Sequence, residues 1–87
     1  LKLEAEGAEP EILLGCGSAL SRIKYISADV GFERGLKQES TLPDVANILI
    51  REGFEMVDMV YPRLVCLFQN KNYIEKWDLA YAYNLFI

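Results

Sequence analysis

The chain contains no histidine, and this absence removes several kinds of chemistry at once. Without an imidazole among its 87 residues, the chain by itself supplies neither a Ser-His-Asp triad nor a histidine-ligated zinc site. Basic residues are also few and scattered, because nine Lys and Arg face thirteen Asp and Glu, for a net charge of −4. Nucleic-acid binding depends on dense positive charge, so we expect no nucleic-acid partner.

Long apolar runs and cysteine motifs are missing as well. Apolar stretches extend over only a few residues, which argues against a transmembrane helix, and the first residues have no signal-peptide layout. Cys16 and Cys66 belong to no CxxC pair, and the composition is not that of a disulfide scaffold. We therefore expect two buried free thiols in a cytoplasmic protein that does not bind membranes.

What the sequence does contain is a regular succession of strand and helix signals. Alternating apolar residues predict strands at residues 1–6, 24–30, 54–60 and 64–68. The turn at residues 61–63 makes the last two an antiparallel hairpin. The order β-α-β-α-β-β indicates an α/β fold in which the first strands run parallel.

Two helices are predicted between these strands. The first begins at Glu9, and Gly15 and Gly17 make it short or broken, because glycine weakens a helix. The second begins after Thr41, the predicted N-cap, and ends before Gly53.

A C-terminal extension, residues 71–87, follows a domain that we place at residues 1–70. It carries Tyr73, Trp77 and Tyr81 four residues apart, a spacing that suits a helix, whereas its last residues are apolar on all sides and fit either a helix or a strand. Such an aromatic stripe is more typical of core or interface packing than of a ligand cage.

Acidic residues and glycines stand where the first two strands end. Glu4 and Glu6 precede Gly7, and Asp29 follows the second predicted strand. Parallel strands open their carboxyl ends to one shared crevice. Carboxylates there can orient a substrate hydroxyl, accept its proton, or ligate a divalent cation, so Glu4, Glu6 and Asp29 are candidate catalytic residues.

Each of these assignments has a structural alternative. Glu6 can cap the following helix while Glu4 faces solvent. Gly31, Glu33 and Arg34 follow the second strand and are candidates for substrate binding, because loops at that edge vary with specificity. The alternative for Arg34 is a local salt bridge with Glu33 or Asp29.

The run LKLEAEGAEPEILLG at residues 1–15 resembles the LKxDxEGAExxxLxG segment of the FkbM-type family of S-adenosylmethionine-dependent methyltransferases. The resemblance continues at residues 23–31, 33–35, 53–55 and 63–70. It implies strands four to seven of a seven-stranded Rossmann-like sheet, in which the final strand inserts antiparallel. Glu4 departs from the family pattern, which usually has aspartate there.

The resemblance also implies a reaction and a cofactor. It predicts O-methylation of a small-molecule or sugar hydroxyl by S-adenosylmethionine, with Glu4 and Gly7 lying near the cofactor. The family's Gly-rich cofactor loop belongs to the half of the sheet that precedes these strands. Gly15 and Gly17 form the only GxG here, and they follow a helical stretch rather than a strand, which is the wrong context for such a loop.

A second hypothesis needs no catalysis. A first strand without its neighbour leaves a sheet edge open to pairing with another chain. The chain is then a non-catalytic α/β module that forms a homodimer through this edge and its apolar C-terminus.

For the isolated 87-residue chain we predict no measurable binding of S-adenosylmethionine, because the Gly-rich loop is missing from it. Isothermal titration calorimetry of the chain tests this expectation. Micromolar affinity would contradict it.

Overall fold

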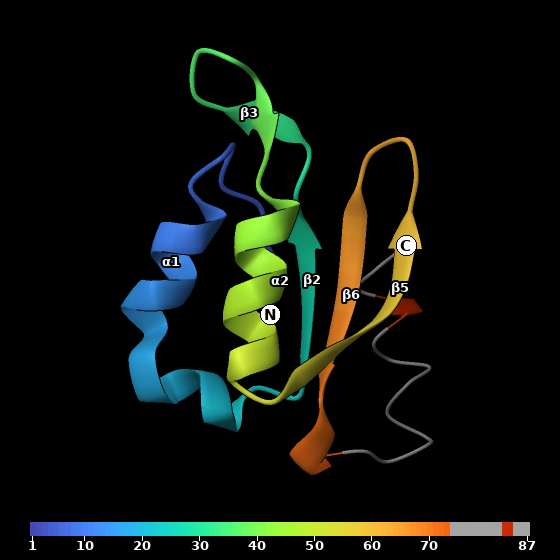
Figure 1. Cartoon of the computed structure of the whole chain (residues 1–87). Coiled ribbons are helices and arrows are strands. Elements are labelled where there is room, and N and C mark those ends of the chain that lie inside the picture. The colour runs from blue at the N-terminus through green and yellow to red at the C-terminus, as the bar shows by residue number, and fades with distance from the viewer. Residues whose placement is uncertain (74–82, 85–87) are drawn as a thin grey trace.

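A four-stranded mixed sheet with two helices on one face forms the body of the protein (Figure 1). The computed structural model describes residues 1–73 and 83–84. The strands are β1 (Lys2–Leu3), β2 (Tyr25–Asp29), β5 (Phe54–Val60) and β6 (Val65–Asn70), in the spatial order β1-β2-β6-β5. The helices are α1 (Glu9–Cys16) and α2 (Leu42–Arg51). The α/β class predicted from the sequence is confirmed.

The sheet combines one parallel and two antiparallel pairings. β1 runs parallel to β2, with Lys2 opposite Ser27 and Leu3 opposite Ala28. β6 lies between β2 and β5 and is antiparallel to both. The predicted hairpin of the last two strands is therefore present, and its second strand occupies the interior of the sheet.

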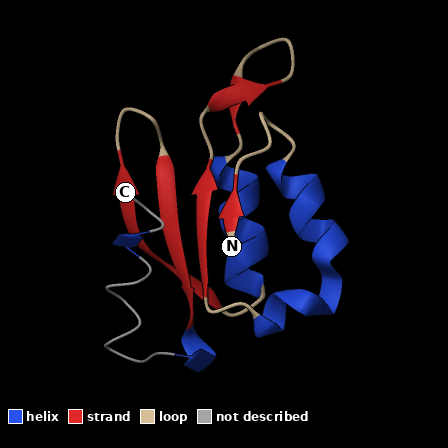
Figure 2. Cartoon of the chain, turned by 180° about the vertical axis from the view of Figure 1, so that it is seen from behind, coloured by secondary structure: helices blue, strands red, loops and turns tan. Residues whose placement is uncertain are grey.

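The main core lies between the sheet and the two helices. Along β2 and β6 every second side chain faces the helices, and Ile26, Phe68 and Leu49 of α2 are fully buried there. The opposite face carries a smaller cluster around Tyr25 and Leu67. In Figure 2 the molecule is seen from behind, so this face is toward the viewer and α1 and α2 lie on the far side of the sheet.

Both helices follow the predicted start and stop signals, with one correction. Gly17, at a φ of 53°, ends α1, and a 3-10 turn, η1 (Gly17–Arg22), continues the chain. Gly53, at a φ of 91°, follows the end of α2. Thr41 is at the N-cap position of α2, but its side chain does not cap the helix. The Ser40 hydroxyl instead accepts the Leu42 N–H at 3.1 Å.

Two predicted segments differ from the structure. The first strand stops at Leu3, because the chain then turns and Glu6 adopts a left-handed φ of 48°. Residues 32–35, expected to be a loop, begin a second, two-stranded sheet made of β3 (Phe32–Arg34) and β4 (Glu39–Ser40). Gly35 and Gln38, with φ of 70° and 53°, form the turn between its strands.

The predicted aromatic helix falls mostly on residues that the structure does not describe. Tyr73 ends a short 3-10 turn, η2 (Lys71–Tyr73). Trp77 and Tyr81 lie outside the described residues. In the part of the chain that is described, no helix combines the length and the apolar character needed to span a membrane.

Gly7 occupies a position that only glycine fits. Its φ is 103°, in the left-handed region that L-residues avoid. A Cβ atom there would lie 2.8 Å from the Glu33 carbonyl oxygen and 2.9 Å from the Arg34 Cα. Both contacts are backbone atoms of β3, so the β1–α1 loop and the β3–β4 hairpin pack directly on each other.

We predict that Gly7→Ala lowers the free energy of unfolding by about 1–3 kcal/mol, because it adds backbone strain and a clash with β3. Urea denaturation followed by circular dichroism measures this loss. Gly15→Ala is the matched control: a Cβ at Gly15 would meet no atom within 4 Å, and the helix should gain up to about 1 kcal/mol. Equal effects of the two substitutions would contradict the prediction.

Candidate functional site

The carboxyl ends of β1 and β2 lie side by side, as the parallel arrangement predicted. Their pairing places the residue after Leu3 level with Asp29, so Glu4 and Asp29 mark the same edge of the sheet. The β3–β4 hairpin rises from this end of the molecule (Figure 1). The candidate catalytic edge is therefore present, although its side chains are arranged differently from the prediction.

Glu4 and Glu6 do not share the face of a strand, because β1 ends before both of them. Both side chains are exposed. The Glu4 carboxylate lies 3.6 Å from the Lys2 ammonium, and both side chains are more than half exposed, so this pair contributes little to stability. Ala8 rather than Glu6 is the N-cap residue of α1, so the capping alternative for Glu6 stays a prediction.

Glu9 holds the loop that carries these two glutamates. Its side chain is only 2% exposed. One oxygen, Oε2, accepts the Ala5 N–H at 2.8 Å and the Gly7 N–H at 3.2 Å. The other, Oε1, accepts the Thr41 hydroxyl at 2.9 Å. Glu9 thus ties the β1–α1 loop to the start of α2.

The sequence showed Glu9 only as an acidic residue in the first turn of a helix. Acidic residues are common there because they interact with the positive end of the helix dipole. Its two amide donors lie two and four residues away, but its third partner, Thr41, lies 32 residues further along the chain. This long-range hydrogen bond has no local sequence signal.

Asp29 is the best oriented of the candidate catalytic carboxylates. Its side chain is 21% exposed, and Oδ1 accepts the Gly31 N–H at 3.1 Å. Oδ2 lies 3.9 Å from a guanidinium nitrogen of Arg63, in the turn between β5 and β6. A Cβ at Gly31 would lie 3.3 Å from Asp29 Oδ1 and 3.4 Å from the Arg63 carbonyl oxygen, so the site is closely packed.

Arg34 forms a salt bridge, but with neither of the partners expected from the sequence. Its guanidinium donates to both carboxylate oxygens of Glu11, at 2.7 and 2.6 Å, and to the Gly7 carbonyl. These hydrogen bonds lower the pKa of Glu11 to about 2 and raise the pKa of Arg34. Glu33 is exposed at the surface of β3. The structure therefore directs Arg34 toward α1 rather than toward Asp29.

The two cysteines are free, as predicted. Cys66 is buried, and burial raises the pKa of its thiol to about 11, so the thiolate that nucleophilic chemistry needs is suppressed. Cys16 is half-buried.

Metal-binding groups do not gather at the edge. Within residues 1–73 and 83–84, no three His, Cys, Asp or Glu side chains are arranged so that they could hold a metal ion. The alternative in which Glu4, Glu6 and Asp29 jointly ligate a cation is not supported by their positions.

Comparison with known proteins adds no relative. No family model, curated protein or solved structure matches this chain. The resemblance to FkbM-type methyltransferases therefore stays a prediction.

We predict that Thr41→Val lowers the free energy of unfolding by about 1.5–3 kcal/mol, because it removes a buried hydrogen bond to a charged group. Glu9→Gln should also be destabilising, because an amide replaces one of the accepting oxygens. The free energy of unfolding should fall less in the double variant than the sum of its falls in the two single variants, since both changes break the same contact.

Urea denaturation measures these changes, and hydrogen exchange of the Ala5 and Gly7 amides reports on the loop itself. Thr41→Ser keeps the hydroxyl and serves as the matched control. Strict additivity of the two substitutions, with unchanged exchange at Ala5 and Gly7, would show that Glu9 does not hold the loop.

Proposed function

We propose that this chain forms the carboxyl-terminal part of an S-adenosylmethionine-dependent methyltransferase that methylates a hydroxyl of a small molecule or sugar. The observation that carries the proposal is the strand order β1-β2-β6-β5, with β6 antiparallel to both of its neighbours. The family that the sequence resembles has this arrangement in strands four to seven. The motif at residues 1–15 and the strand order support the proposal independently, because the first is local and the second is tertiary.

The outer side of β1 supports the same proposal. Leu1 directs both of its backbone groups to β2, since its N–H donates to the Tyr25 carbonyl at 2.9 Å and its carbonyl accepts the Ser27 N–H at 2.9 Å. Successive residues of a strand bond to opposite sides, so the N–H and C=O of Lys2 point away from β2. A further strand can pair there.

The helix beside this edge is apolar on more than one side. Leu13 is fully buried, whereas Ile12 and Leu14, about 100° to either side of it, are 43% and 65% exposed. A helix that is apolar nearly all round usually has neighbours on several sides. An additional strand and helix at the β1 edge, as in the first half of a methyltransferase sheet, would cover Ile12.

The chain's own residues fit the handling of a substrate hydroxyl better than the binding of the cofactor. Bound S-adenosylmethionine would supply the methyl group. Gly15 and Gly17 lie at the end of α1 rather than after a strand, so they do not form its Gly-rich binding loop. We assign acceptance of the hydroxyl proton to Asp29, which accepts the Gly31 N–H and lies near Arg63, and Glu4 follows the end of the neighbouring strand β1.

The test is methyl transfer by the complete open reading frame that encodes this chain. We expect transfer of labelled methyl groups from S-adenosylmethionine to a hydroxyl compound, and a loss of at least about 100-fold in kcat for Asp29→Asn, because a general base contributes that much. Glu52→Gln, an exposed change at the end of α2, is the control. An initiation codon directly before Leu1, or full activity in Asp29→Asn, would contradict the proposal.

The alternative, a non-catalytic module that dimerises, is favoured by the exposure of Leu1 and Ile12 next to the open edge of β1. Size-exclusion chromatography with light scattering separates the two functions. A stable dimer that shows no methyl transfer supports association, and a monomer at micromolar concentration excludes it.

A further inference from the structure

A groove between α1 and α2 is lined by apolar and charged side chains, with charged residues at both of its ends. Its volume is about 350 Å³, within the range of small-molecule sites. Its apolar lining residues are Pro10 and Leu14 of α1 and Ile48 of α2. Leu14 is 65% exposed, which leaves a large apolar surface uncovered. The groove lies on the helix face of the sheet, so this site is separate from the edge that carries Glu4 and Asp29.

The end of the groove near β3 has an excess of negative charge. α1 and α2 both begin at this end (Figure 1), and their first turns carry Glu11 and Asp44. Arg34 lies here, and two of its guanidinium nitrogens already donate hydrogen bonds to the two oxygens of the Glu11 carboxylate. One guanidinium therefore faces two carboxylates in the groove lining, Glu11 and Asp44. A ligand ammonium would be stabilised at Asp44.

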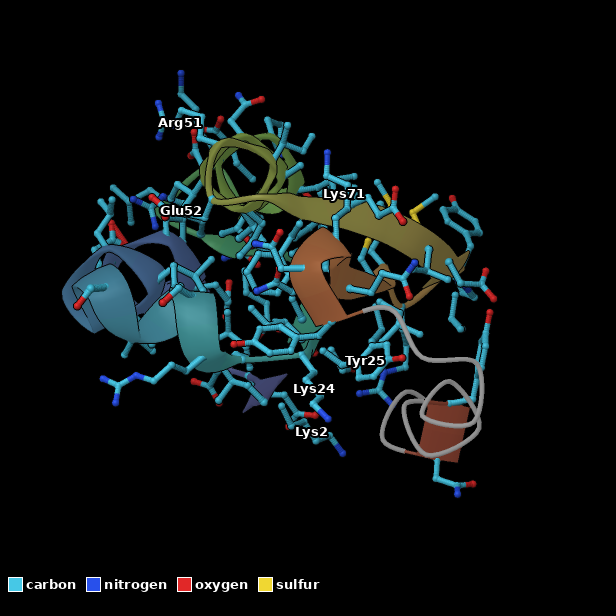
Figure 3. The ribbon with its side chains drawn as sticks, turned by 90° about the horizontal axis from the view of Figure 1, so that it is seen from below. Lys2, Lys24, Tyr25, Arg51, Glu52 and Lys71 are labelled. Atoms are coloured by element: carbon cyan, nitrogen blue, oxygen red, sulfur yellow. The ribbon has the colours of Figure 1, made fainter. Side chains whose placement is uncertain are left out.

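The other end of the groove is positive. Arg51 lines it from the last turn of α2, and Figure 3 shows this residue on the side of the helix that faces away from the sheet. Long side chains on a helix lean toward its N-terminus, and Asn47, one turn before Arg51 on α2, also lines the groove. Among the ion pairs of the described residues, none involves Arg51. Its guanidinium can take a carboxylate.

We propose that this groove binds a small aliphatic zwitterion, with its ammonium at Asp44, its carboxylate at Arg51 and its aliphatic body on Leu14 and Ile48. Asp44 and Arg51 are two helical turns apart, or about 10 Å along the axis. A free amino acid carries its ammonium and carboxylate on one carbon, and a dipeptide separates them by one further residue, so the two ligands test two different spans. Both share the same chemistry, and the inference does not depend on the methyltransferase proposal.

The test is an NMR titration of the 87-residue chain with L-leucine and with the dipeptide Leu-Leu. Two single-charge analogues, 4-methylpentanoate and 3-methylbutylamine, serve as matched ligands. We expect saturable shifts at Leu14, Asn47 and Ile48, and at least tenfold tighter binding of a zwitterion than of either analogue. The tighter of the two zwitterions identifies the length that the groove takes.

Three variants complete the test. Arg51→Gln and Asp44→Asn are surface changes that should each weaken zwitterion binding at least fivefold. Arg22→Gln, an exposed change in η1 outside the groove, should leave it unchanged. Absence of saturation, equal binding of the single-charge analogues, or equal affinities of all three variants would each overturn the proposal.

Discussion

The buried carboxylate of Glu9 is the constraint on which the end of the molecule beyond β1 and β2 depends. A carboxylate in an apolar interior is costly unless it is hydrogen-bonded, so its partners must stay in place. Those partners are the amides of Ala5 and Gly7 and the hydroxyl of Thr41. They belong to the β1–α1 loop and to the start of α2. One side chain therefore couples the position of the candidate catalytic loop to the packing of the second helix.

A second layer of contacts adds the β3–β4 hairpin to this unit. Gly7 lies so close to Glu33 and Arg34 that no Cβ fits between them. Arg34 then bonds to the Gly7 carbonyl and to Glu11 on α1. The β1–α1 loop, the β3–β4 hairpin and the start of α2 are thereby held together at one end of the sheet. The proposed site requires such contacts, because reacting groups must be held in place before a substrate arrives.

The two surfaces that we assign chemistry to differ in their electrostatics. At the strand ends, the Asp29 carboxylate accepts a backbone N–H and lies near the guanidinium of Arg63. In the groove between the helices, Asp44 and Arg51 lie two helical turns apart, as the proposed recognition of a ligand with separated charges requires. Arg34, which the sequence placed at the first surface, belongs to the second, because Glu11 rather than Asp29 is its partner.

Local sequence alone determined the elements whose signals repeat along the chain. The strand at 54–60, the helix after Thr41 and the break at Gly17 all appear as predicted, because side-chain periodicity and glycine conformation are local properties. Tertiary structure alone decided where the first strand ends, which residues Glu9 and Arg34 bind, and that Arg63 meets Asp29. These contacts join residues 23 to 34 positions apart, such as Arg34 with Glu11 or Arg63 with Asp29, and no periodic pattern encodes them. They follow from burial and from the pairing of polar groups once the sheet has formed.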